Sequence, residues 1–196
     1  MNDKIEKSAV REPRALAPSA PPSGRRTHLR VITPEDLPLI EQWWEEPEAN
    51  YLDGGDTGGP SYQFRNGFKN RVLQGRETNW FVIETLATPP GPVGYLLYRT
   101  YPEEQNSAEV AVRLSRSSWG MGYGSEAFGL FIDHLFRVLG FQQIWLTVYI
   151  FNPRAIRIYE KAGFREEATF ADEKGLELLK MTLTRSEYER KRRCQN

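Results

Sequence analysis

The sequence of 196 residues holds one cysteine, two histidines and no long hydrophobic run. Cys194 has no second cysteine with which to form an intrachain disulfide. So few cysteines and histidines cannot supply the usual ligand sets of a zinc site, so we expect no metal. The apolar runs are far shorter than the roughly 20 residues of a transmembrane helix, and the first residues lack the apolar core of a signal peptide. These absences predict a soluble, cytoplasmic protein with no membrane partner.

An excess of charge of either sign is also missing, since 26 Lys and Arg residues balance 26 Asp and Glu residues. A chain without net charge creates no overall field that would attract nucleic acid. A nucleic-acid or ribosome contact through the basic N-terminal residues and the run Arg190–Arg193 is an alternative, but such runs are more often solvated ends. We therefore expect no nucleic-acid partner. The proportions of hydrophobic (39%) and charged (27%) residues are those of a globular protein.

Three regions follow from composition. Residues 1–26 combine four prolines with Ala, Ser, Arg and Lys without periodicity, which predicts a disordered tail. Residues 27–186 have the patterning of one folded domain, and residues 187–196 form a charged C-terminal end.

The first half of the domain begins with a strand around Leu29 and Val31, followed by a helix. Thr33 is the predicted N-cap of that helix, and Pro47 is predicted to stop it. The glycine-rich stretch Leu52–Pro60 predicts a flexible loop. A second helix is expected over residues 61–73, with Gly75 as its C-terminal glycine.

Beyond this point the pattern changes from a β meander to alternating strands and helices. The predicted strands are Trp80–Thr85, Val93–Arg99, Ala108–Leu114, Gln143–Ile150, Phe164–Phe170 and Leu176–Thr184, and the predicted helices are Gly122–Leu139, Pro153–Ala162 and a charged C-terminal helix. The fold class is therefore α+β, a mixed sheet of six or seven strands with helices on both faces.

A glycine-rich loop lies between the strand Ala108–Leu114 and the long helix that follows. Its sequence is Trp119-Gly120-Met121-Gly122-Tyr123-Gly124. Glycines let the backbone turn sharply and approach a ligand, and the free amides at a helix start bind anions such as a diphosphate. The spacing differs from the dinucleotide-binding motif and from the P-loop. A plain turn remains the alternative for a glycine cluster on its own.

A second segment removes much of that ambiguity. Asn152 stands at a strand end and helix start, Tyr159 follows two helical turns later, and the segment closes with Gly163-Phe164. Together the two segments resemble the coenzyme A loop and the N-x-x-A-x-x-x-Y-E-K-x-G-F stretch of the GNAT superfamily of N-acetyltransferases, particularly its Rim-type branch of ribosomal-protein N-terminal acetyltransferases. The resemblance extends from about Leu29 to Leu183.

This resemblance implies a GNAT-like fold with a splayed central strand pair, and acetyl-CoA as co-substrate. Trp119 departs from the Gln or Arg that usually opens the family's loop, but the glycines are intact. Arg154 and Arg157 are further candidates for phosphate contacts, with plain solvation as the alternative. Asn152 fits either a contact with the pantetheine arm or a helix N-cap. The implied cofactor-binding residues are Val112, Arg113, Leu114, Trp119, Gly120, Met121, Gly122, Tyr123, Gly124, Ser125, Asn152 and Ala155.

The chemistry that the resemblance implies is acetyl transfer to a primary amine by direct attack in a ternary complex. An alkylamine is protonated at pH 7 and must lose a proton before it attacks. Glu109 is the candidate base, with a water chain, or simple solvent exposure of this side chain, as alternatives. Tyr159 is the candidate acid for the departing thiolate, with hydrophobic packing as its alternative. A backbone amide in the strand around Val112–Leu114 is the candidate oxyanion donor.

The acceptor is the least defined part. Trp43, Trp44, Tyr51 and Asp53 occupy the region that lines the acceptor cleft in the family, and they are the predicted substrate-binding residues. Acids beside aromatic rings suit an aminoglycoside or polyamine, and a solvated acidic loop is the alternative. A protein N-terminus and a small-molecule amine both remain open, as does a non-catalytic coenzyme A-binding module. The chain is expected to be a monomer or a homodimer.

Overall fold

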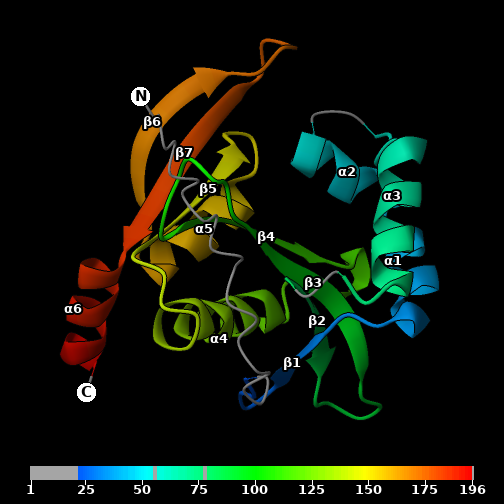
Figure 1. Cartoon of the computed structure of the whole chain (residues 1–196), viewed down its shortest axis with the longest axis horizontal. Coiled ribbons are helices and arrows are strands. Elements are labelled where there is room, and N and C mark those ends of the chain that lie inside the picture. The colour runs from blue at the N-terminus through cyan, green and yellow to red at the C-terminus, as the bar shows by residue number, and fades with distance from the viewer. Residues whose placement is uncertain (1–21, 55–56, 77–78, 196) are drawn as a thin grey trace, which may run out of the picture.

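Among residues 22–54, 57–76 and 79–195, which the computed structural model describes, seven strands form one mixed sheet (Figure 1). The strand order is β1-β2-β3-β4-β5-β7-β6, and only β4 and β5 run parallel. The strands are β1 (Thr27–Val31), β2 (Trp80–Thr85), β3 (Gly91–Arg99), β4 (Ser107–Leu114), β5 (Gln143–Tyr149), β6 (Arg165–Ala171) and β7 (Glu177–Thr184). The predicted α+β class with a mixed sheet is confirmed.

The same part of the chain contains six α-helices and two short 3-10 helices. They are α1 (Leu37–Trp43), α2 (Pro47–Gly54), α3 (Tyr62–Leu73), α4 (Tyr123–Arg137), α5 (Pro153–Ala162), α6 (Arg185–Gln195), η1 (Pro34–Asp36) and η2 (Arg116–Ser118). None of the described helices is both long and apolar enough to cross a membrane.

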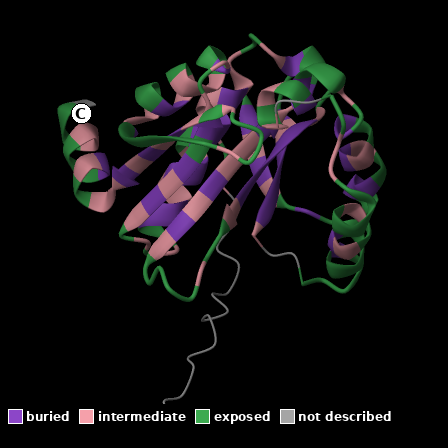
Figure 2. Cartoon of the chain, turned by 90° about the horizontal axis from the view of Figure 1, so that it is seen from above, coloured by how far each residue is buried: buried purple, intermediate pink, exposed green. Residues whose placement is uncertain are grey.

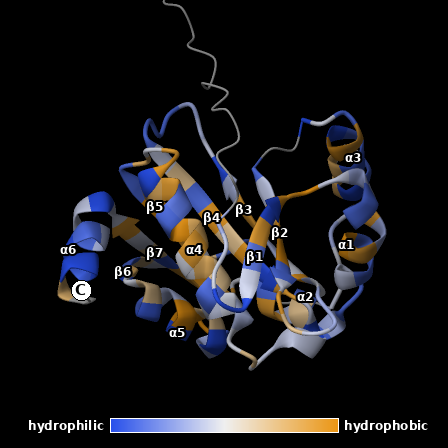
Figure 3. Ribbon diagram, turned by 90° about the horizontal axis from the view of Figure 1, so that it is seen from below, coloured by the Kyte–Doolittle hydropathy of each residue, from blue (hydrophilic) through white to orange (hydrophobic). Residues whose placement is uncertain are grey.

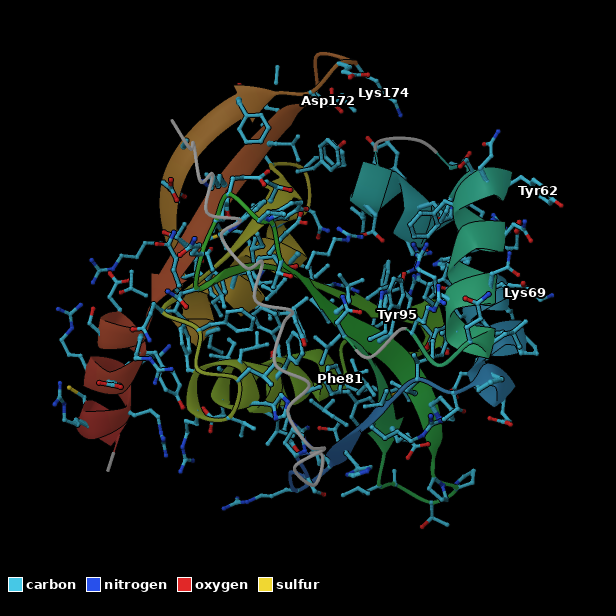
Figure 4. The ribbon with its side chains drawn as sticks, in the orientation of Figure 1. Tyr62, Lys69, Phe81, Tyr95, Asp172 and Lys174 are labelled. Atoms are coloured by element: carbon cyan, nitrogen blue, oxygen red, sulfur yellow. The ribbon has the colours of Figure 1, made fainter. Side chains whose placement is uncertain are left out.

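The sheet has a hydrophobic cluster on each face. On one face α4 and α5 pack on strands β1 to β5 and β7 through a core that includes Phe81 and Phe128. On the other face α1 and α3 pack on β2 and β3 through residues that include Trp44, Phe68 and Tyr95. Phe81 and Tyr95 point to these two opposite sides (Figure 4), and buried residues are concentrated along the central strands (Figure 2). The alternation of side chains along a strand produces this two-sided core.

The region between α1 and α3 differs from the sequence prediction. Pro47 does not end a helix but begins α2, which extends to Gly54 and therefore includes the first part of the predicted loop. Proline is tolerated in the first turn of a helix, where its missing N–H would have no helical acceptor. The prediction of α3 was accurate, since the Ser61 side chain accepts a hydrogen bond from the amide of Phe64 and caps this helix.

Both ends of the described chain contact α4. The backbone and the side chain of Arg26 donate to the carboxylate of Glu126, so the residues just before β1 are attached to the domain. At the other end, α6 is mostly hydrophilic (Figure 3), but its Tyr188 is buried and stacks on Phe136. The predicted boundary at residue 186 therefore falls inside a packed helix. Of the tail predicted at residues 1–26, residues 1–21 lie outside the described part of the chain.

The central strands β4 and β5 are paired only over their first residues. The pairs are Ser107–Gln143, Ala108–Ile144 and Glu109–Trp145, after which β4 stays with β3 and β5 stays with β7. The strands therefore diverge toward their carboxyl ends and leave a V-shaped opening. This confirms the predicted splayed strand pair.

Gly94 in β3 lets β3 approach the wider end of β4. A Cβ atom at Gly94 would lie 2.2 Å from the carbonyl oxygen of Arg113 and 2.8 Å from Cα of Leu114. We expect Gly94→Ala to lower the free energy of unfolding by about 2 kcal/mol, because the backbone of β4 must shift. Gly91 of the same strand is the matched control, since a Cβ there meets nothing within 4 Å. Urea denaturation that gives equal stabilities for Gly94→Ala and Gly91→Ala would contradict this prediction.

Candidate active site

A cleft of about 980 Å³ occupies the opening between β4 and β5. Its walls come from β4, β5, the glycine loop, α5, and the carboxyl end of α2. Of the predicted cofactor-binding residues, those that line the cleft are Val112, Arg113, Leu114, Trp119, Gly120, Gly122, Gly124, Ser125, Asn152 and Ala155. The cleft thus brings together the two segments that carried the sequence resemblance.

The glycine loop runs along the cleft and opens directly into α4. Gly120 and Gly122 both have φ of +79°, a conformation that side-chain-bearing residues rarely adopt. Gly122 is the N-cap of α4, and the first helical bond runs from the amide of Glu126 to the carbonyl of Gly122. The amides of the first turn before Glu126 have no helical acceptor, as at every helix start, and are available to an anion.

Arg26 binds the carbonyl oxygens of the glycine loop. Its guanidinium donates to the carbonyl oxygens of Met121 and Gly122 at 3.0 and 3.4 Å. Met121 and Tyr123 do not line the cleft, although both were predicted to bind the cofactor. Met121 is half exposed and Tyr123 packs against the core under α4.

Trp119, the residue that departs from the usual loop pattern, lies between two arginines. The guanidinium of Arg116 lies 4.8 Å from the centre of a Trp119 ring, and that of Arg154 lies 4.4 Å away. The indole N–H donates to the carbonyl of Leu114 at 3.1 Å, which fixes the ring at the end of β4. Cation–π attraction therefore positions two positive charges beside the glycine loop. Sequence reasoning missed the role of Arg116, because nothing in spacing reveals which ring a guanidinium meets.

Backbone amides of β4 also face the opening. The amide of Ser115 donates to the carbonyl of Val93 in β3. Because amides in an antiparallel strand point alternately to the two sides, those of Val112 and Leu114 point away from β3, toward the opening. Pairing with β5 has already ended there. The amide of Arg113 has the opposite direction and faces β3, so it does not belong with the other two as predicted.

The side chain of Arg113 is only 7% exposed and binds the α1–α2 region. Its Nη1 donates to Oδ2 of Asp53 at 2.9 Å, and its Nη2 donates to Oδ1 of Asn50 at 2.8 Å and to the carbonyl oxygen of Trp43. The Nε of Arg113 is buried and has no partner among the described residues. Arg113 thus ties α2 to β4, and it also lines the cleft, where its predicted contact with the cofactor stays a prediction.

Asp53 is the last carboxylate of α2 and lines the cleft. Its side chain is 49% exposed. Desolvation in this position raises the pKa of Asp53 to about 6, although the charge and the hydrogen bond of Arg113 act in the opposite direction.

Glu109 also lines the cleft and does not project into solvent, since its side chain is 17% exposed. The hydroxyl of Tyr101 donates to Oε2 of Glu109 at 2.6 Å, and Nη1 of Arg99 donates to the same oxygen at 3.2 Å. The sequence analysis names Glu109 as a candidate base, but it does not predict that Tyr101 and Arg99 bind this carboxylate. Tyr101 follows β3, and its contact with β4 depends on the hairpin between these strands.

The ring of Tyr159 packs against Phe128 and Phe164, with ring centroids 5.2 and 6.1 Å away. The residue is buried and lines the cleft, and its hydroxyl has no hydrogen-bond partner among the described residues. Burial raises the pKa of Tyr159 well above its ordinary value, and the negative charge of Asp53 adds to this effect. The phenol is therefore protonated at neutral pH.

Asn152 has the capping contact that was predicted as one of its two roles. Its Oδ1 accepts a hydrogen bond from the amide of Ala155 at 3.2 Å, and its Nδ2 donates to the carbonyl of Leu52 at 3.4 Å. The same side chain thus begins α5 and holds the last turn of α2.

The predicted acceptor residues do not all reach the cleft. Trp44 lines it and donates from Nε1 to the hydroxyl of Tyr95 at 3.1 Å. Trp43 lies in the core between α1 and the sheet, so it is unavailable to a ligand. Tyr51 is half exposed and packs on Phe151 outside the cleft. Both tryptophans belong to the core on this face of the sheet, where Trp43 is 4% and Trp44 1% exposed, and only Trp44 also borders the cleft.

No group of three or more His, Cys, Asp or Glu side chains in the described part of the chain is arranged to hold a metal ion. The polar groups that line the cleft include two carboxylates paired with arginine, further basic side chains on α5, tyrosines and asparagines.

Comparison with known proteins gives one family. Residues 26–165 match the family described as acetyltransferase (GNAT) domain. The spermidine N(1)-acetyltransferase of Vibrio cholerae is 28% identical over 135 residues, which are 69% of this chain and 70% of the relative. The solved structure of spermidine N-acetyltransferase from Vibrio cholerae in complex with CoA and spermine has a TM-score of 0.70 at 20% identity, over 83% of this chain and 98% of that one. The structure of AAC(6')-Ib with ribostamycin and coenzyme A has a TM-score of 0.67 at 23% identity, over 86% and 98%. At 20% and 23% sequence identity, these two solved structures show that this chain shares their fold.

Asn152→Ala is expected to lower the free energy of unfolding by about 1 kcal/mol, because the first turn of α5 loses its cap. Ser61→Ala removes the cap of α3 and should cost a similar amount. Because only Asn152 also donates to Leu52, only Asn152→Ala should accelerate amide hydrogen exchange in the last turn of α2. Equal exchange in the two variants would contradict the proposed link between α5 and α2.

Proposed function

The chain belongs to the acetyltransferase (GNAT) family and is an acetyl-CoA-dependent N-acetyltransferase, and on that premise we propose that it acetylates a small-molecule primary amine by direct attack within a ternary complex. The observation that carries this proposal is the cleft between the parted strands β4 and β5. It has anion-binding amides and arginines near the glycine loop, and two carboxylates, Asp53 and Glu109, elsewhere along its walls.

Acetyl-CoA fits this arrangement through its charged and extended parts. Backbone amides from Gly120 to Ser125 would bind the diphosphate, assisted by Arg154 on the Trp119 ring. The pantetheine arm would follow the opening between β4 and β5, where Asn152 and Ala155 line the wall. The thioester carbonyl would then accept hydrogen bonds from the amides of Val112 or Leu114. A donor of this kind stabilises the transition state by about 3 kcal/mol.

Tyr159 suits the step in which the thiolate leaves. Its hydroxyl lines the cleft, is protonated at neutral pH and has no hydrogen-bond partner among the described residues. It would donate its proton to the departing sulfur while the C–S bond breaks, and recover a proton from the nitrogen of the new amide. The net reaction converts an ammonium ion and a thioester into an amide, a thiol and one released proton.

Several acids around the cleft are paired with arginine. The ion pairs are Asp53 with Arg113, Glu109 with Arg99, Glu45 with Arg65, and Glu48 with Arg116. This pairing reduces the negative potential that a long polycation would need. We therefore favour an acceptor with few positive charges over a long polyamine.

Two further acceptors have specific support. The sequence relative from Vibrio cholerae acts on spermidine, which favours a polyamine, and the fold is shared with AAC(6')-Ib bound to ribostamycin, an aminoglycoside. The likeness of the sequence motifs to the Rim-type branch favours a protein N-terminus instead. A screen by mass spectrometry that offers acetyl-CoA with short amines, polyamines, aminoglycosides and N-terminal peptides separates these acceptors. A protein that binds coenzyme A but releases no thiol with any of them would be a non-catalytic module.

Tyr159→Phe should lower kcat by at least about 100-fold, since the variant keeps the ring packing but has no proton to donate. The affinity for acetyl-CoA and the melting temperature should stay close to those of the wild type. Tyr188→Phe is the matched control, because Tyr188 is equally buried but donates to Asp133 on α4, outside the cleft. The kcat of both variants is measured from the steady-state rate of thiol release. Similar kcat values for Tyr159→Phe and wild type would rule out the acid role.

Trp119→Ala should raise the Kd for coenzyme A about tenfold, because the ring no longer positions Arg116 and Arg154. Trp145→Ala removes a different cation–π contact, with Lys180 at 5.4 Å, and Trp145 does not line the cleft. Isothermal titration calorimetry should detect weaker binding only for Trp119→Ala. Equal affinities would exclude the arginine arrangement as a binding element.

A further inference from the structure

The cleft contains two carboxylates that differ in how they are held. Oε2 of Glu109 accepts two hydrogen bonds, one of them from Arg99, and the side chain is mostly buried. Asp53 has one oxygen, Oδ2, on Arg113, while Oδ1 has no partner among the described residues. With 49% of its side chain exposed in the cleft, Asp53 has an oxygen available for an incoming ligand.

Three other elements fix the end of α2 that bears Asp53. Arg113 of β4 holds Asp53 itself, Asn152 at the start of α5 donates to the carbonyl of Leu52, and Nζ of Lys174 donates to the carbonyl of Gly54 at 3.1 Å. Lys174 lies at the tip of the β6–β7 hairpin, close to the end of α2 (Figure 4). Because β4 and α5 lie on the two sides of the opening, the last turn of α2 spans the cleft.

Asp53 is also close to the groups assigned to the reaction. Its binding partner Arg113 lies in β4 between Val112 and Leu114, whose amides face the opening. Its charge acts on the hydroxyl of Tyr159, which is the proposed acid. The Asp53 carboxylate therefore lines the same cleft as the proposed oxyanion donors and the proposed proton donor.

We propose that Asp53 binds the ammonium group of the acceptor and removes its proton, acting as the general base of this enzyme in place of Glu109. This inference rests on the proposed function and deepens it by naming the group that activates the amine.

The ammonium group of the acceptor transfers one proton to Oδ1 of Asp53, which becomes a neutral carboxylic acid, and leaves a free amine. The nitrogen lone pair forms the C–N bond at the thioester carbonyl, and the C–S bond then breaks as the thiolate takes the proton of Tyr159. Tyr159 recovers the second proton of the nitrogen, and Asp53 releases its proton to solvent.

The surroundings of Asp53 fit a base that works near neutral pH. The groups that face it are Arg113 of β4, Tyr159 of α5 and Tyr95 of β3, with Lys174 bonded to the adjacent Gly54. Desolvation raises the pKa of Asp53 to about 6. The carboxylate is therefore ionised at pH 7, and it is a better proton acceptor than an ordinary aspartate.

The pH dependence of kcat/KM tests the proposal directly. For the wild type, kcat/KM should rise tenfold per pH unit below about pH 6 and level off between pH 7 and 9, because Asp53 must be ionised. Asp53→Asn should lose at least about 100-fold at pH 7. This loss should shrink toward pH 9, because a variant without a base uses amine that is already deprotonated in solution. Asp53→Glu should recover part of the activity.

Two other variants serve as comparisons. Glu109→Gln should change the amplitude of the profile but keep the rise near pH 6. Asp133→Asn, which alters a carboxylate on α4 that binds Tyr188 outside the cleft, should match the wild type throughout. Calorimetry with coenzyme A should give the same Kd for Asp53→Asn and wild type within about twofold, which shows that the fold is intact.

The outcomes are distinguishable. If Asp53→Asn loses activity equally at every pH, or if the rise near pH 6 disappears in Glu109→Gln, Asp53 is not the base although the enzyme remains an acetyltransferase. If kcat/KM of the wild type does not rise near pH 6, the wild-type profile alone rules out Asp53 as the base. If the wild type releases no thiol with any amine, the proposed function and this inference fail together.

Discussion

The separation of β4 from β5 after Glu109 and Trp145 is the constraint on which the rest of the structure depends. An unpaired strand edge within a sheet normally leaves backbone amides without acceptors, which is costly when they are buried. Here each strand keeps one complete antiparallel neighbour, β3 for β4 and β7 for β5, so the sheet remains stable while the opening persists. The amides of β4 beyond Glu109 that point away from β3 are thereby left without a partner in β5 and can donate to a ligand.

The buried guanidinium of Arg113 positions one wall of the opening, but its burial lowers the stability of the fold. A guanidinium that is 7% exposed loses most of its hydration, and a buried ion pair rarely stabilises a fold more than well-packed apolar residues would. Its unpartnered Nε adds to that cost. What the arginine provides is position, because its contacts with Asp53, Asn50 and Trp43 hold α2 across the cleft. An apolar side chain would not hold a carboxylate at this place.

Local sequence signals predicted much of the fold and most of the residues of the glycine loop and α5 that line the cleft. The end of α3 at Gly75, the end of α5 at Gly163 and the glycine loop each depend on a few neighbouring residues, so the sequence predicts them without tertiary structure. Contacts between segments that are far apart in the sequence could not be predicted from local patterns. Asp53 and Arg113 are 60 positions apart, and their pairing depends on α2 starting at Pro47, which pattern reasoning had assigned as a helix stop. The acceptor side of the cleft is made mainly of such contacts.

Charge is distributed unequally along the cleft, and the proposed chemistry uses this inequality. Arg154, Arg157 and Lys161 of α5 line the cleft without a carboxylate partner among the described ion pairs, whereas Asp53 and Glu109 each face an arginine. This distribution would favour an anionic co-substrate bound with its phosphates toward α5 and its thioester toward α2, as the proposed function requires. Acetylation converts the ammonium group into a neutral amide, which cannot form an ion pair with Asp53. If Asp53 binds the acceptor as proposed, the reaction removes this attraction, and the product leaves more readily than the substrate.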